Sequence, residues 1–201
     1  MTHEEELAEY SRQRLGGRDL PADLAKLLVL QWQQGAADAD PLGAMGVTLL
    51  EVGETHNSLD HSYLNDKDRA DPDILANVAA MKSTCEHAVF VARNQDAAII
   101  GYWLGPENVG IDAAPILKLD SEGQFALLEG TTLSEALLGN HVFEDAERFA
   151  ELKAEFAKVG IAISGDSWDE LPYPKSPTDP GVFHEEWYVE NRNKAGLPPY
   201  R

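Results

Sequence analysis

The 201-residue sequence lacks the features that several common classes of function require. It has a single cysteine, Cys85, which excludes an internal disulfide and a zinc site built from several thiolates. Basic residues are also scarce: 16 Lys and Arg stand against 35 Asp and Glu, for a formal net charge of −19. Such a surface repels nucleic-acid phosphates and anionic membranes. We therefore expect no nucleic-acid or membrane partner, and a cationic protein partner is favoured.

Long hydrophobic runs are missing as well. The longest, such as 27–30 and 97–100, fall far short of the roughly 20 apolar residues that span a bilayer. The N-terminal stretch MTHEEELAEY is acidic and polar, whereas a secretory signal is basic and then apolar. The composition, 43% hydrophobic and 25% charged, is that of an ordinary globular protein. These features predict a cytoplasmic protein with one main domain.

Apolar spacing and capping residues predict several helices. Asp71-Pro72 is typical of a helix start, and Thr132-Leu133-Ser134-Glu135 is typical of a capping box in which side chain and backbone bond reciprocally. Segment 53–70, which holds His56 and His61, has no clear period and is predicted to be irregular. The expected helices cover 3–15, 21–34, a segment from Pro72 onward, 133–138 stopped by Gly139, 143–159 and 184–191.

Alternating or continuous apolar runs separated by short polar turns predict strands. Asn94-Gln95-Asp96 and Asp120-Ser121-Glu122-Gly123 have the composition of hairpin turns. The expected strands are 47–52, 87–93, 97–104, 115–119 and 124–128, with a brief one at 161–163. Consecutive strands joined by tight turns form antiparallel sheets. The predicted fold is therefore α+β, a mainly antiparallel sheet of about four to six strands with helices packed on it.

The composition changes near Asp166, after which prolines and aromatic residues become frequent. That much aromatic surface favours packing over disorder. We expect residues 1–140 to form the α+β domain, with 141–201 as a helix and a Pro/aromatic-rich extension packed on it.

No catalytic motif stands out. The sequence has no glycine-rich phosphate loop, no HExxH zinc frame and no G-x-S-x-G nucleophile elbow. Cys85 lies near His87, and His56, Asp60 and His61 form a local cluster, so a small hydrolase is a possible alternative. Isolated residues of this kind are more often structural. We therefore expect no enzyme activity, no metal and no cofactor.

Two segments carry a resemblance to a known family. Leu20-Pro21-Ala22-Asp23-Leu24 followed by LLVLQWQQG resembles the opening of the SUKH superfamily, whose members are related to a yeast cell-wall glucan-synthesis regulator. The block IIGYWLGPENVGIDAAPILKLDSEGQFALLEGTTLSEALLG is similar to that family's strands and the helix after them. The resemblance covers about residues 3–140. It departs from the family at Gln95-Asp96-Ala97, in segment 53–70 and after Asn140.

The resemblance implies a function of a particular kind. Bacterial members of the superfamily are mostly immunity proteins, which bind and neutralise a cognate toxin, often a nuclease, without catalysis. An acidic inhibitor suits a basic nuclease, because its charge steers it to the positive nucleic-acid groove. A regulatory scaffold without a toxin partner is the alternative. Acidic and aromatic residues in loops are the candidate partner contacts, although Trp103 and, to a lesser degree, Tyr102 also fit a sheet core. The candidates are Glu54, Asp60, Tyr102, Glu107 and Asp112.

Overall fold

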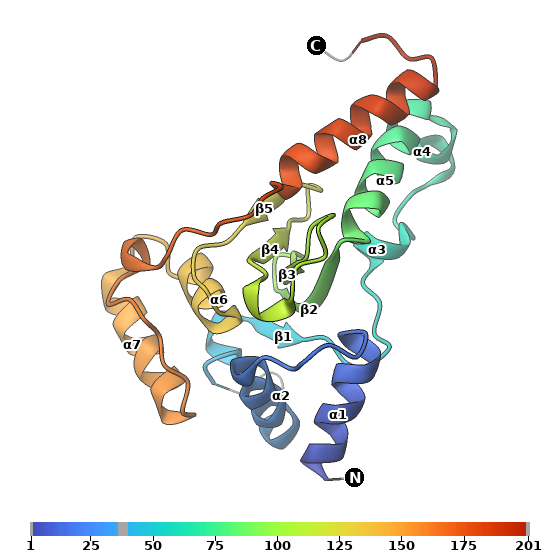
Figure 1. Cartoon of the computed structure of the whole chain (residues 1–201). Coiled ribbons are helices and arrows are strands. Elements are labelled where there is room, and N and C mark those ends of the chain that lie inside the picture. The colour runs from blue at the N-terminus through green and yellow to red at the C-terminus, as the bar shows by residue number, and fades with distance from the viewer. Residues whose placement is uncertain (1, 36–39, 200–201) are drawn as a thin grey trace.

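The structure is a computed structural model that describes residues 2–35 and 40–199 (Figure 1). In this part of the chain a five-stranded antiparallel sheet has the strand order β1-β2-β3-β4-β5, so each strand pairs with its neighbour in sequence. The α+β class and the antiparallel sheet are thereby confirmed. The strands are β1 (Val47–Leu49), β2 (Ala88–Asn94), β3 (Ile99–Trp103), β4 (Ile116–Leu119) and β5 (Phe125–Leu127).

Helices precede, interrupt and follow the strands. The α-helices are α1 (His3–Arg14), α2 (Ala22–Gln34), α3 (Asn57–Asp60), α4 (Asp66–Ala70), α5 (Pro72–Cys85), α6 (Leu133–His141), α7 (Ala146–Lys158) and α8 (Pro180–Lys194). Short 3-10 turns are η1 (Gly43–Met45), η2 (Ile111–Ala113) and η3 (Trp168–Glu170). Within the described residues, no helix has the length and apolar character needed to cross a bilayer.

Both faces of the sheet are buried. On one face Ile100 belongs to an apolar cluster with Leu27 of α2 and Leu137 of α6. On the other face Ile99 clusters with Met81 of α5. Figure 1 shows the sheet between these two groups of helices, with α5 and α8 on one side. Burial on both faces explains why the central strands are almost continuously apolar instead of alternating.

An irregularity in the pairing of β2 and β3 requires a glycine at one position. The register of the two strands shifts between Phe90 and Ala92, opposite Gly101. A Cβ atom at Gly101 would lie 2.1 Å from the Val89 carbonyl oxygen and 2.5 Å from Phe90 Cα. Only glycine permits this approach of the two backbones.

The C-terminal extension covers the second face of the sheet. Helix α8 packs along α5 and reaches β5. Indole Nε1 of Trp103 donates a 2.8 Å hydrogen bond to the Thr178 carbonyl just before α8. The Phe183 ring then lies 5.9 Å from the Trp103 ring and 5.2 Å from that of His87, centre to centre. The extension thus provides part of the core on this face.

Polar contacts fix the other end of α8. Tyr188 donates a 2.8 Å hydrogen bond to the carboxylate of Asp73, in the first turn of α5. Arg192, which is largely buried, pairs with the same carboxylate. Since Asp73 follows the predicted Asp71-Pro72 helix start, the confirmed beginning of α5 also determines where α8 is held.

Segment 53–70 is not wholly irregular, contrary to the prediction. It contains the two short helices α3 and α4, each of which begins with a side-chain cap. His56 accepts from the Ser58 backbone N–H, and Asn65 forms a capping box with Asp68. A periodicity argument misses helices of one turn, because so few residues show no repeat.

The predicted start of α6 is only half correct. Thr132 Oγ1 accepts from the Glu135 backbone N–H at 3.2 Å, as expected. The Glu135 carboxylate does not return to Thr132. It accepts instead from the Thr131 N–H at 2.8 Å and from the Ser164 N–H at 2.9 Å. The reciprocal box is therefore wrong, and Glu135 joins two loops.

Several other elements also differ from expectation. Helix α6 continues through Gly139, which lies against Leu171, where a Cβ atom would be 2.8 Å from Leu171 Cδ1. Residues 161–163 form no strand. Helix α8 begins four residues before the predicted 184, because Asp179 caps it and Pro180 occupies its first turn. This Asp-Pro pair repeats the start of α5, so the sequence did contain the signal.

Candidate partner-binding groove

Two hollows share part of their lining beside the 3-10 turn η2. Asp112 of η2 and Thr131 line both, and each hollow measures about 380 Å³. The first also takes in the start of α2, β3 and the start of α6. The second takes in the segment around Tyr173 that leads toward α8. We call the two hollows together the η2 groove.

Side chains from distant segments brace the first hollow. Asp23 Oδ2 accepts from both the backbone N–H and the hydroxyl of Ser134, each at 2.9 Å. The ammonium group of Lys26 donates to the Gly160 carbonyl. Asp23 therefore caps α6 from the first turn of α2, and its carboxylate has a fixed place in the wall.

Tyr102 lies beneath this hollow. Its side chain is only 3% exposed, and its hydroxyl has no hydrogen-bond partner among the described residues. Burial raises the pKa of Tyr102 well above its ordinary value, and the nearby carboxylates of Asp23 and Asp112 add to the effect. The phenol is therefore neutral at physiological pH. The carboxylates of Asp23 and Asp112 in the lining of this hollow suit a cationic group such as a lysine or arginine head.

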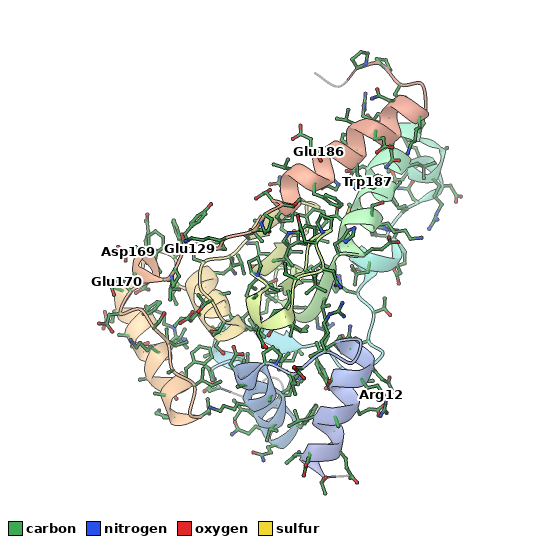
Figure 2. The ribbon with its side chains drawn as sticks, viewed as in Figure 1. Arg12, Glu129, Asp169, Glu170, Glu186 and Trp187 are labelled. Carbon is green, nitrogen blue, oxygen red and sulfur yellow. The ribbon has the colours of Figure 1, made fainter. Side chains whose placement is uncertain are left out.

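One exposed aromatic side chain lines the groove, and two other aromatic side chains pack on each other outside its lining. Tyr173, at the second hollow, is 79% exposed. Phe143 is 66% exposed, and its ring packs on that of Trp168 with centroids 4.6 Å apart. We call these three residues the aromatic rim. Figure 2 shows three acidic residues at the same end of the molecule: Glu129, Asp169 and Glu170. Exposed aromatic residues accompanied by charged ones are typical of protein-binding surfaces.

The five predicted contact residues do not form one site. Tyr102 and Asp112 both line the η2 groove, although the burial of Tyr102 makes it part of the floor and not a surface anchor. The other three, Glu54, Asp60 and Glu107, do not line the groove.

Each of those three residues has a contact within the protein. Glu54 pairs with Arg93 at 3.3 Å. Asp60 accepts from the Ser62 backbone N–H at 2.9 Å. Glu107 accepts from the Thr178 hydroxyl at 2.6 Å, a bond that lowers the pKa of Glu107.

Trp103 is fully buried, in agreement with the core position favoured for it.

The residues considered for catalysis do not assemble into a reactive group. Cys85 ends α5 and His87 lies in the following turn, so the two do not share a strand face. Burial raises the pKa of the Cys85 thiol to about 12, so it is not a thiolate at neutral pH. His56 caps α3. Among the residues with a described structure, no group of three or more His, Cys, Asp or Glu side chains could hold a metal ion.

The aromatic rim was not among the predicted contacts. Its members lie in or near the Pro/aromatic-rich extension, for which the sequence predicts packing on the domain and leaves a role in partner binding open. The alternation of Trp168 and Tyr173 with acidic residues and prolines in 168–174 is the signal that could have identified it.

Comparison of the chain with models of protein families, with curated proteins and with solved structures finds no significant match in any of the three. The resemblance to the SUKH superfamily remains a prediction based on the residues quoted for it.

Proposed function

We propose that the protein is a non-enzymatic bacterial immunity protein that neutralises a basic toxin, of the nuclease class, by binding it directly in the cytoplasm. The observation that carries this proposal is the η2 groove, where the carboxylates of Asp23 and Asp112 and the exposed Tyr173 line one surface of a chain with a net charge of −19. The SUKH resemblance leads to the same class of function.

In this role the charge and the groove have different tasks. The negative field of the whole molecule accelerates the encounter with a basic surface. A lysine or arginine side chain of the toxin then enters the first hollow between Asp23 and Asp112. Tyr173 and the rest of the aromatic rim provide the apolar contact that slows dissociation.

The test compares two double variants of equal charge. Asp112→Lys with Tyr173→Ala alters the groove; both side chains are exposed, and Asp112 has no ion pair among the described residues. Glu185→Lys with Val182→Ala makes the same change of charge and also truncates an exposed hydrophobic side chain, at positions of α8. Each tagged protein is used to capture partners from the native host at low and moderate salt.

We expect the wild type and the α8 variant to capture one basic protein that salt releases, and the groove variant to lose it. That protein should arrest growth when expressed alone and be tolerated when co-expressed with the wild type. Equal capture by the groove variant would show that the partner binds at another surface. Capture of several housekeeping proteins, or of none, would favour the regulatory scaffold instead.

A further inference from the structure

The turn between α6 and α7 presents an aromatic side chain to solvent. The N–H of Asp145 donates to the Val142 carbonyl at 2.9 Å and closes a β-turn with Phe143 and Glu144 at its centre. Val142 is buried, whereas Phe143 is 66% exposed. Glu144 has a φ angle of +62°, in the left-handed region that residues other than glycine seldom adopt. The turn therefore holds Phe143 outward at a backbone cost, a feature that is common at functional surfaces.

The exposed ring lies on a second aromatic residue from a distant segment. The centroids of Phe143 and Trp168 are 4.6 Å apart, and the ring planes are inclined by 46°. Trp168 is half-buried at the start of η3, so its indole supports the phenyl ring from one side. We call Phe143 and Trp168 the aromatic pair. It offers an aromatic face that is open to solvent and is held in place by contacts within the protein.

Carboxylates follow both members of the aromatic pair in the sequence. Glu144 and Asp169 are exposed, and neither forms an ion pair within the described residues. Figure 2 shows Asp169 and Glu170 together at this end of the molecule. The base in the first turn of α7, Arg148, pairs with Glu151 at 2.9 Å, which offsets its charge. The aromatic pair thus lies in a negative local field.

An aromatic face beside carboxylates suits arginine better than other side chains. The planar guanidinium of arginine stacks on an aromatic ring while its N–H groups reach carboxylates, whereas the lysine ammonium is compact and strongly hydrated. A purely apolar partner would desolvate the carboxylates without pairing them, and a second copy of this acidic chain would bring like charges together. We propose that the aromatic pair, with the carboxylates of Glu144 and Asp169, binds an arginine side chain of the basic partner.

This proposal rests on the proposed function for the identity of the partner protein, and it adds which side chain of that partner the aromatic pair takes. Neither Phe143 nor Trp168 lines the η2 groove, so the two surfaces can be tested separately. A small probe that carries the arginine side chain requires no toxin. Its result therefore does not depend on whether the groove captures a protein from the host.

Titration of the full, isotopically labelled chain with N-acetyl-arginine amide tests the proposal by NMR. The indole N–H signal of Trp168, one of four tryptophans, is assigned with Trp168→Phe. We expect a saturable shift of this signal. N-acetyl-lysine amide, which carries the same charge without a planar group, should bind about threefold more weakly, the effect of losing one exposed cation–π contact. N-acetyl-citrulline amide keeps the planar group without the charge and should also bind more weakly than arginine.

Variants of exposed residues separate the aromatic contact from the charge. Phe143→Leu keeps an apolar side chain but removes the aromatic face, so it should weaken arginine binding about threefold, to the level of lysine. Tyr63→Leu makes the matched change at an aromatic residue that is 51% exposed between α3 and α4, and it should change nothing. Glu144→Gln with Asp169→Asn should weaken the binding of arginine and lysine alike.

Equal affinities for the arginine and lysine probes would overturn the proposal, as would arginine binding that is unchanged in Phe143→Leu. A Trp168 signal that does not respond to arginine would overturn it too. Citrulline that binds as tightly as arginine would show that the surface does not select a cation. Melting curves of the variants establish that each is folded.

Discussion

Among single residues, Glu135 joins segments that are far apart in the sequence. Its buried carboxylate accepts from Thr131 before α6 and from Ser164 after α7. Burial alone would raise the pKa of Glu135, but the hydrogen bonds from Ser164 and Thr131 outweigh it and hold the pKa below its ordinary value. The folded state is therefore stabilised by the ionised carboxylate.

Glu135→Gln should lower the free energy of unfolding by about 2 kcal/mol at pH 7, because the amide replaces an acceptor by a donor. A depressed folded pKa contributes stability that is complete above the ordinary glutamate pKa of about 4.3 and is lost as the pH falls through the folded value. The difference in the free energy of unfolding between wild type and variant, measured by urea unfolding, should thus become smaller below about pH 4. Glu185→Gln, at an exposed position of α8, serves as the control. A gap of constant size at all pH values would contradict this account.

At the scale of elements, α8 completes the second face of the sheet. Its Phe183 ring lies against Trp103 and His87, while Tyr188 and Arg192 hold its other half to Asp73 of α5. Contacts of both kinds, apolar and polar, therefore fix the helix on the sheet.

Phe183→Ala should cost about 2 kcal/mol, somewhat less than a fully buried phenylalanine, because the ring is only partly covered. Val182→Ala, one residue earlier and 55% exposed, should cost much less. Urea unfolding followed by tryptophan fluorescence measures both free energies of unfolding, and the summed emission of the four tryptophans should shift to longer wavelength if α8 detaches. Equal losses in the two variants would mean that α8 does not stabilise this face.

At the scale of the whole molecule, charge opposes compactness. The chain has a net charge of −19, so its acidic side chains repel one another. Added salt shortens the range of that repulsion from about 30 Å at 0.01 M to about 8 Å at 0.15 M. The melting temperature should therefore rise by about 2–4 °C over this range, equivalent to about 1 kcal/mol. NaCl and KCl should act alike, since the effect is screening. A melting temperature that stays constant or falls would show that local ion pairs outweigh the net repulsion.

The sequence by itself determined the features that depend on neighbouring residues. The Asp71-Pro72 start of α5, the two hairpins around 94–96 and 120–123 and the α+β class all follow from local chemistry. Turn residues and caps satisfy backbone groups a few positions away, so their signals are readable in a short window of sequence. The net charge is likewise a property of composition alone.

Only the tertiary structure decided which distant residues meet. Tyr102 lies next to a loop, and the sequence predicts it as a partner contact. In the structure it is buried beneath Asp23 and Asp112. Phe143 and Trp168 share no motif, yet the turn after α6 and η3 bring their rings into contact. Such sites depend on how helices pack against a sheet. The free energy of the whole core determines that packing, and this free energy cannot be estimated from a short segment of sequence.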